Sequence, residues 1–156
     1  TVLPAFTSVT AMSAWNPLAR PVPVAGPRVA LAAVSEDTEL VVLDPTSDSE
    51  FAIRRPALWS ISQSQSWTPC YLDPEVLTAF RDAAAHEPAV LALTLAPGDP
   101  TARLAGPELL VRLTLEEGLD RPALDAVMAR LARRWAASEV IAERVDSLKV
   151  QLLSAA

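Results

Sequence analysis

The chain has 156 residues, 51% of them hydrophobic and 21% charged, so it can bury a core and lacks the composition of a disordered segment. Its net charge is −6 and Lys149 is its single lysine, which disfavours nucleic-acid binding, since that binding depends on basic residues that neutralise phosphates. The single cysteine excludes an internal disulfide. No apolar run reaches the ~18 residues of a membrane span. Since no signal peptide is visible either, we expect a cytoplasmic protein that does not contact a membrane.

The first part of the chain predicts short strands and helices. Apolar runs and alternation indicate the strands, while Ser/Thr caps and first-turn prolines indicate the helices. The predicted elements, in chain order, are a strand at 2–6, a helix at 9–15 after a Thr7-Ser8 cap, an extended segment at 20–24, a helix at 27–35, a strand at 40–43 buried on both faces, a strand at 51–53 in which Phe51 and Ile53 alternate with their neighbours, and a helix at 56–63. The strand at 2–6 enters without a preceding partner, so we expect this part to lack its first strands.

A polar segment of low complexity, Ser-Ile-Ser-Gln-Ser-Gln-Ser at 60–66, separates the two parts. Such shifts in composition are typical of domain boundaries. We therefore predict two small domains, residues 1–66 and residues 67–156.

The second part has clearer periodicity. Asp73 before Pro74 and Asp120 before the pattern Leu124, Val127, Met128, Leu131 and Trp135 indicate two capped amphipathic helices. Strands are predicted at 90–95, 109–115 and 148–152. The order α-β-β-α-β favours an antiparallel sheet with helices on one face, and the whole chain is predicted to be an α+β (mixed α/β) protein of two sheet-and-helix modules.

Residue types that carry catalysis or bind metals are sparse. Cys70 and His86 are the one cysteine and the one histidine, and they flank a predicted helix of about 18 Å, at ~1.5 Å per residue, which keeps them apart. A zinc site needs several such ligands at characteristic spacing, and the four glycines form no phosphate-binding motif. We expect no enzyme, no metal and no cofactor.

Two groups of side chains stand above this background. Arg54 and Arg55 precede Trp59, with Trp67 nearby in sequence, and this combination suits binding of a carboxylate or a peptide. The alternative is that both tryptophans pack between the two domains while the arginines lie in solvent. The second group, Arg130, Arg133 and Arg134, is interpreted as the solvated basic side of its helix.

An ordered set of short motifs runs along the chain: Leu3-Pro4-Ala5-Phe6-Thr7-Ser8, Trp15-Asn16-Pro17, Arg20-Pro21-Val22-Pro23-Val24, Val42-Leu43-Asp44-Pro45, Arg55-Pro56-Ala57-Leu58-Trp59, Trp67-Thr68-Pro69, Asp73-Pro74 and Arg144-Val145-Asp146-Ser147-Leu148. This set resembles actinobacterial proteins of the SseB (enhanced serine sensitivity) family, with an N-terminal SseB domain followed by a C-terminal one. The resemblance implies no catalytic residues, because the family name refers to a growth phenotype linked to serine.

Together these features favour a non-enzymatic protein-interaction or adaptor module with a protein partner. The alternative is a small-molecule sensor that binds an amino acid between the two domains, near Arg55, Trp59 and Trp67. An exposed first strand could also pair with a second copy of the chain and give a homodimer.

Overall fold

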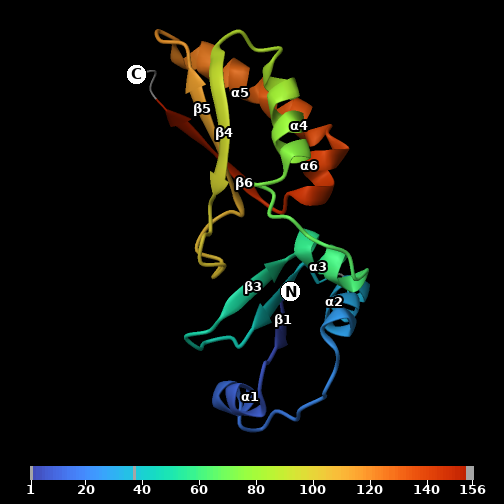
Figure 1. The fold of residues 1–156 in the computed structure, drawn as a ribbon. Helices are drawn as coiled ribbons and strands as arrows, with labels where there is room; N and C mark the ends of the chain where they lie inside the picture. Colours follow the sequence, from blue (N-terminus) through green and yellow to red (C-terminus); the bar gives the residue numbers. More distant parts are fainter. Residues whose placement is uncertain (1, 37, 154–156) are drawn as a thin grey trace. The chain divides into compact units, whose positions relative to one another are not determined.

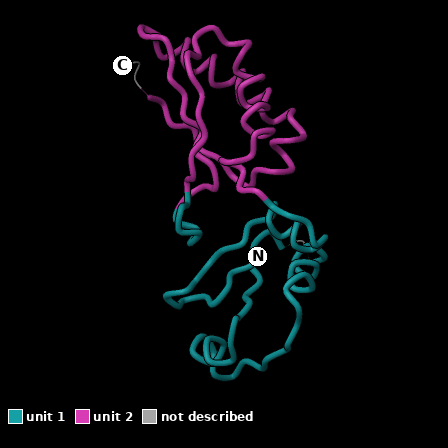
Figure 2. The backbone as a smooth tube through the Cα atoms, viewed as in Figure 1, with its two compact units in different colours: residues 1–67, 99–105 teal, residues 68–98, 106–156 magenta. Residues whose placement is uncertain are grey.

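The computed structural model describes residues 2–36 and 38–153, which form two compact units. The first unit consists of residues 1–67 together with 99–105, and the second of residues 68–98 together with 106–156 (Figure 2). Each unit contains its own three-stranded sheet with helices packed against it. The predicted α+β class is therefore confirmed.

The sheet of the first unit has the order β1-β2-β3. Strand β1 (Val2–Ala5) pairs parallel with β2 (Leu40–Leu43), which pairs antiparallel with β3 (Phe51–Arg54). The parallel pair is possible because the connection between β1 and β2 is long enough to cross over, passing through α1 (Val9–Trp15) and α2 (Gly26–Ser35) (Figure 1). The strand predicted at 2–6 thus finds its partner later in the chain.

The core of this unit forms where α2 and α3 (Arg55–Ser62) meet β2. Ala30, Ala33, Val41 and Leu58 are its fully packed residues. In β3, Phe51 is exposed and Ala52 is buried, while the half-buried Ile53 packs on the core.

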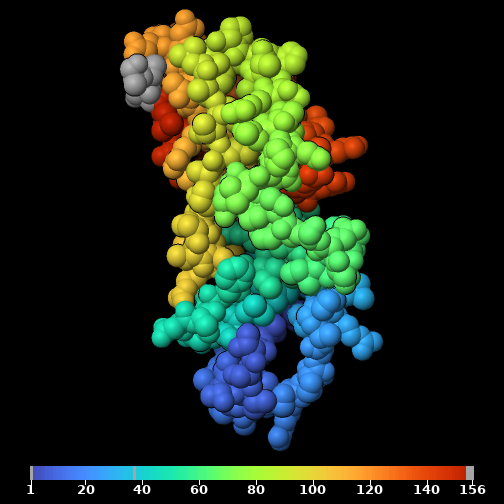
Figure 3. All heavy atoms as spheres, in the orientation of Figure 1, coloured from blue at the N-terminus to red at the C-terminus, as the bar shows by residue number. Residues whose placement is uncertain are grey.

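Helix α1 and the segment after it extend away from this core. Ser8 caps α1 as predicted, by accepting a hydrogen bond from the Ala11 N–H at 3.0 Å. Beyond the helix, Leu18 and Val22 are exposed, and the space-filling view shows an opening between the dark-blue helix and the lighter-blue chain that follows (Figure 3).

Asp44 fixes the end of β2. Its buried carboxylate accepts hydrogen bonds from the Thr7 N–H (2.8 Å) and the Thr7 hydroxyl (2.6 Å), which hold the end of β1 beside it. These bonds keep the pKa of Asp44 below its usual value, although burial works the other way. Asp44 also adopts φ 44°, a left-handed conformation that aspartate tolerates better than most residues.

The sheet of the second unit has the order β4-β5-β6, formed by β4 (Val90–Pro97), β5 (Leu109–Leu115) and β6 (Leu148–Leu153). The expectation of an antiparallel sheet is wrong for one pair. Strands β4 and β5 are antiparallel, but β5 and β6 run parallel. The physical reason is the helical connection between β5 and β6, which returns the chain to the end at which β5 began.

Three helices cover one face of this sheet: α4 (Pro74–Ala84), α5 (Arg121–Ala136) and α6 (Glu139–Arg144) (Figure 1). Asp73 and Asp120 cap the first two as predicted. Helix α6 was not predicted, so the order becomes α-β-β-α-α-β. Six residues give too short a pattern to show helical periodicity, and the Ser138 cap was its one sequence signal.

The core of the second unit lies between β5 and these helices. Leu109, Val111 and Leu113 are fully buried on the inner face of β5, as its alternation predicts. Phe80 of α4 and Trp135 of α5 meet edge to face above the strand, with ring centroids 5.2 Å apart.

The segment 99–105, which connects β4 to β5, belongs to the first unit. The Ala52 N–H of β3 donates to the Ala102 carbonyl at 2.6 Å, so the segment covers the outer edge of β3. Its two ends come together at Gly98 and Gly106: a Cβ on Gly106 would lie 2.7 Å from the Gly98 carbonyl oxygen, and a Cβ on Gly98 would collide with the Pro107 carbonyl. Only residues without a side chain permit this approach.

Candidate functional site

The four residues singled out from the sequence all lie in the first unit, and three of them belong to α3 or to its N-cap. Arg54 ends β3 and occupies the N-cap position of α3, and Arg55 is the first residue of the helix. Trp59 follows one turn later, and Trp67 comes after the polar segment that ends the helix. The four side chains differ in how far they are exposed to solvent, and their roles differ accordingly.

Arg54 is held inside the unit. Its Nη2 donates to Asp99 Oδ2 at 2.9 Å, and the two side chains are only 12% and 2% exposed. Asp99 also accepts from the backbone N–H groups of Arg103 (3.2 Å) and Leu104 (2.9 Å). Burial by itself would raise the pKa of Asp99, but the Arg54 hydrogen bond and these N–H groups keep the pKa below its usual value.

This ion pair gives Arg54 a structural task. It fastens the segment 99–105 to the end of β3, and a hydrogen bond from the Arg103 guanidinium to the Asp48 carbonyl adds a second tie. A buried charge that is already paired has little capacity left for a ligand. Arg55 is half-buried and also has an interaction within the described structure, so neither arginine is a free cation at the surface.

The two tryptophans are the exposed members of the set. Trp59 is 56% exposed and Trp67 is 43% exposed. Helix α3 explains the position of Trp59: Pro56, Ala57 and Leu58 occupy its buried side, so the next residue projects outward. A large exposed indole costs free energy in water, and such residues are enriched where proteins bind each other.

The structure does not activate the Cys70 thiol, and it leaves the His86 imidazole at the surface. Cys70 is buried in the core of the second unit, and burial, reinforced by the charge of Glu108, raises the pKa of its thiol to about 12. A thiol with that pKa holds almost no thiolate at neutral pH. His86 is exposed, with its Nδ1 3.0 Å from the Asp82 carbonyl oxygen of the preceding turn.

The basic side of α5 is not simply solvated, contrary to the sequence interpretation. Arg130 donates from Nε and Nη2 to the two carboxylate oxygens of Glu87, each at 2.8 Å, and Arg134 Nη1 donates to Oε1 at 2.6 Å. Glu87 is 3% exposed. The Arg130 hydrogen bonds, followed by those of Arg134, lower the pKa of Glu87 to about 2 against the opposing effect of burial. Only Arg133 of this group is exposed.

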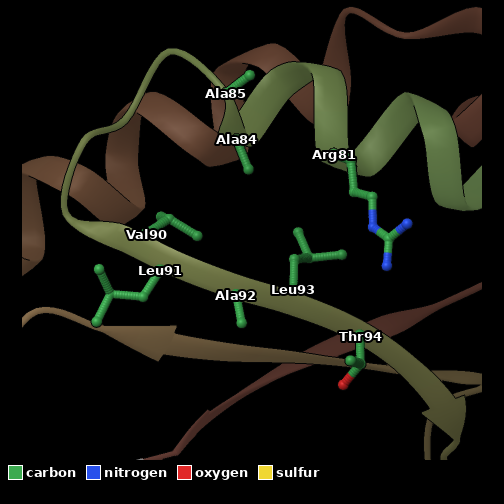
Figure 4. Close-up of a pocket in the computed structure, with 8 residues that line it drawn as sticks. All are labelled: Arg81, Ala84, Ala85, Val90, Leu91, Ala92, Leu93 and Thr94. Atoms are coloured by element: carbon green, nitrogen blue, oxygen red, sulfur yellow. The ribbon is translucent and has the colours of Figure 1, made fainter. Parts of the chain in front are cut away.

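A groove between α4 and β4 was not predicted. It has a volume of about 410 Å³ and is lined by Arg81 and Ala84 of α4, by the C-cap residue Ala85 and by residues 90–94 of β4 (Figure 4). We call it the α4–β4 groove. In the sequence, the groove corresponds to small alanines that lie opposite an edge strand. These alanines can be recognised as the wall of a groove only when the helix and the strand are known to lie together.

Two kinds of feature are absent from the residues that the structure describes. Within residues 2–36 and 38–153, no group of three or more His, Cys, Asp or Glu side chains is arranged to hold a metal ion. No helix in the same residues is long and apolar enough to cross a membrane.

Comparison with known proteins gives one match. Residues 1–60 match the sequence model of the SseB protein N-terminal domain, which supports the resemblance to the SseB family over β1 to α3. The assignment of the second unit as a C-terminal SseB domain stays a prediction, because the matched segment ends before that unit begins. No curated protein and no solved structure matches the chain.

Proposed function

We propose that the protein is a non-enzymatic protein-interaction module, and that Trp59 and Trp67 form the principal contacts of its partner-binding surface. The single observation that carries the proposal is the exposure of both indoles, 56% for Trp59 and 43% for Trp67. Tryptophan supplies more contact area than any other side chain and dominates the energy of many interfaces.

Arg54 and Pro56 support this surface without forming part of it. Arg54 holds the end of β3 through Asp99, and Pro56 gives α3 a rigid first turn. Both fix the helix that presents Trp59. A rigid surface binds with a smaller loss of conformational entropy than a mobile one.

The proposal is tested by affinity capture of the full-length protein from its native host, quantified by mass spectrometry. The baits are the wild type, a double variant Trp59→Ala, Trp67→Ala, and the control Leu72→Ser, which changes an exposed apolar residue of the second unit. We expect a partner that the wild type and the control enrich alike and that the double variant loses.

Two results would contradict this proposal. One is a partner enriched equally by all three baits. The other is no partner for any bait together with a rise in the wild-type melting temperature on addition of millimolar amino acids, since a ligand that binds only the native state stabilises it. That second result would favour the amino-acid sensor instead.

A further inference from the structure

The α4–β4 groove runs beside a strand with a free edge. In the order β4-β5-β6, β4 pairs on one side only. The sheet edges of many proteins are covered, but here the described part of the chain leaves the outer edge of β4 next to an open groove (Figure 4). An edge of this kind can accept an added strand.

The register of the sheet identifies the backbone groups that point outward. The Gly98 N–H donates to the Glu108 carbonyl, and the Leu109 N–H donates toward β6, to the Ser147 carbonyl. Hydrogen-bonded and non-bonded pairs alternate in an antiparallel ladder, so residues 92, 94 and 96 face β5 through their backbone groups. The N–H and C=O groups of Leu93 and Leu95 therefore point away from the sheet. Pro97 is the next outward position, where its missing N–H costs no ladder bond.

The opposite wall of the groove is a helix face with small side chains and one charge. Ala84 and the C-cap residue Ala85 follow Arg81 by three and four residues, which places both on the same side of α4 as Arg81. The alanines leave the space open, and Arg81 extends from the helix toward the strand beside Leu93 (Figure 4). Among residues 2–36 and 38–153, no carboxylate forms an ion pair with Arg81, the one charged residue of the lining.

We propose that the α4–β4 groove binds an extended segment of another protein, which adds as a strand to β4 and places an acidic side chain against Arg81. The outward groups of Leu93 and Leu95 hold the backbone of that segment. Its alternate side chains enter the groove above Ala84 and Ala85. This site lies in the second unit, whereas Trp59 and Trp67 belong to the first.

The test begins with selection from a displayed library of random nine-residue peptides against the full-length chain. We expect enriched peptides that alternate apolar and polar residues and contain an aspartate or glutamate. The highest-ranking peptide, synthesised and labelled with fluorescein, should bind the Arg81→Glu variant at least tenfold more weakly than the wild type. The control Arg133→Glu makes the same charge change at an exposed position of α5 and should leave the dissociation constant unchanged.

A second measurement tests whether the peptide binds as a strand. Two versions of it are N-methylated at alternate residues, one on each hydrogen-bonding edge. One version should keep its affinity and the other should lose it, because only one edge faces β4. In the ¹⁵N spectrum of the full-length chain, the amides of Leu93 and Leu95 should shift with the peptide.

The proposal is overturned if no peptide is enriched, if Arg81→Glu binds as tightly as the wild type, or if both methylated versions bind equally. Protection of the Leu93 and Leu95 amides in a dimer of this chain would also overturn it, in favour of self-association. The two proposals can fail independently of each other. The double variant Trp59→Ala, Trp67→Ala should bind the peptide normally, and the Arg81→Glu variant should still capture the partner of the first unit.

Discussion

Glu87 shows at the scale of a single residue how a charge can be buried in this protein. Its carboxylate lies in the second unit with Arg130 and Arg134 donating to both oxygens. Pairing of this kind offsets the cost of removing the carboxylate from water. The two arginines therefore connect α5 to the turn after α4.

Replacing Glu87 with glutamine should lower the free energy of unfolding near neutral pH by about 2 kcal/mol, since hydrogen bonds to a charged group are lost. The folded-state pKa of about 2 lies below the ordinary 4.5, so the carboxylate's contribution is present above pH 4.5 and is lost as the pH falls toward 2. Urea unfolding across that range should show the wild type and the variant converging at the acidic end.

The matched control for this series is Glu116→Gln, which changes an exposed carboxylate at the end of β5. It should leave the unfolding free energy near the wild-type value throughout. A constant difference between the wild type and Glu87→Gln at every pH would contradict the assigned role of the ion pair.

Cys70 gives a second prediction at this scale. Because its thiol is buried and its pKa is raised to about 12, a thiol-specific reagent such as Ellman's reagent should label the native protein slowly. In urea the same thiol should react at the rate of a free cysteine. Rapid labelling of the native protein would mean that the Cys70 thiol is accessible to solvent and could act as a nucleophile.

At the scale of elements, the close approach of Gly98 to Pro107 is the feature that the addition of one carbon atom would disturb most. Gly98→Ala places a Cβ against the Pro107 carbonyl, and we expect it to cost about 1–3 kcal/mol of unfolding free energy, as overpacking does. Gly26→Ala is the control: a Cβ there meets nothing within 4 Å, and alanine favours the helix. Thermal unfolding of both variants checks the difference; equal melting temperatures would refute it.

Most elements could be predicted from local signals. The caps at Ser8, Asp73 and Asp120 and the alternation around Val111 act over a few residues, so the sequence shows them directly. Helix α6 and the parallel pairing of β5 with β6 could not be predicted in the same way. The first is too short for periodicity, and the second depends on how the chain returns.

The candidate site was predictable only in part for the same reason. Exposure of Trp59 follows from the face of α3, but the burial of Arg54 depends on Asp99, which lies 45 residues away in sequence. Likewise, Glu87 meets Arg130 and Arg134 at sequence separations of 43 and 47. No local pattern records such pairs.

At the scale of the whole molecule, some polar and apolar side chains stabilise the fold, whereas others are exposed and available to a partner. Arg54→Ala should destabilise the first unit by about 3 kcal/mol, because it leaves the buried Asp99 carboxylate unpaired. Hydrogen exchange should quicken at the Ala52 amide and across residues 99–105. Unchanged exchange in that segment would show that Arg54 does not fasten it.

Trp59→Ala, in contrast, should leave stability within about 0.5 kcal/mol of the wild type, as exposed substitutions usually do. Leu58→Ala, at the neighbouring buried position, should cost about 3 kcal/mol. Urea unfolding of the two variants measures this contrast. A large loss of stability for Trp59→Ala would indicate that the indole serves the fold rather than a partner.

Calorimetric titration of the purified captured partner against the full-length chain measures whether Trp59 and Trp67 bind that protein. We expect direct binding by the wild type and by Leu72→Ser. The affinity should be at least tenfold weaker for Trp59→Ala, Trp67→Ala, since truncating an interface tryptophan at a hot spot costs about 2 kcal/mol or more. Equal affinity for the wild type and the double variant, or no direct binding of the purified partner, would contradict a role of the two tryptophans in partner binding.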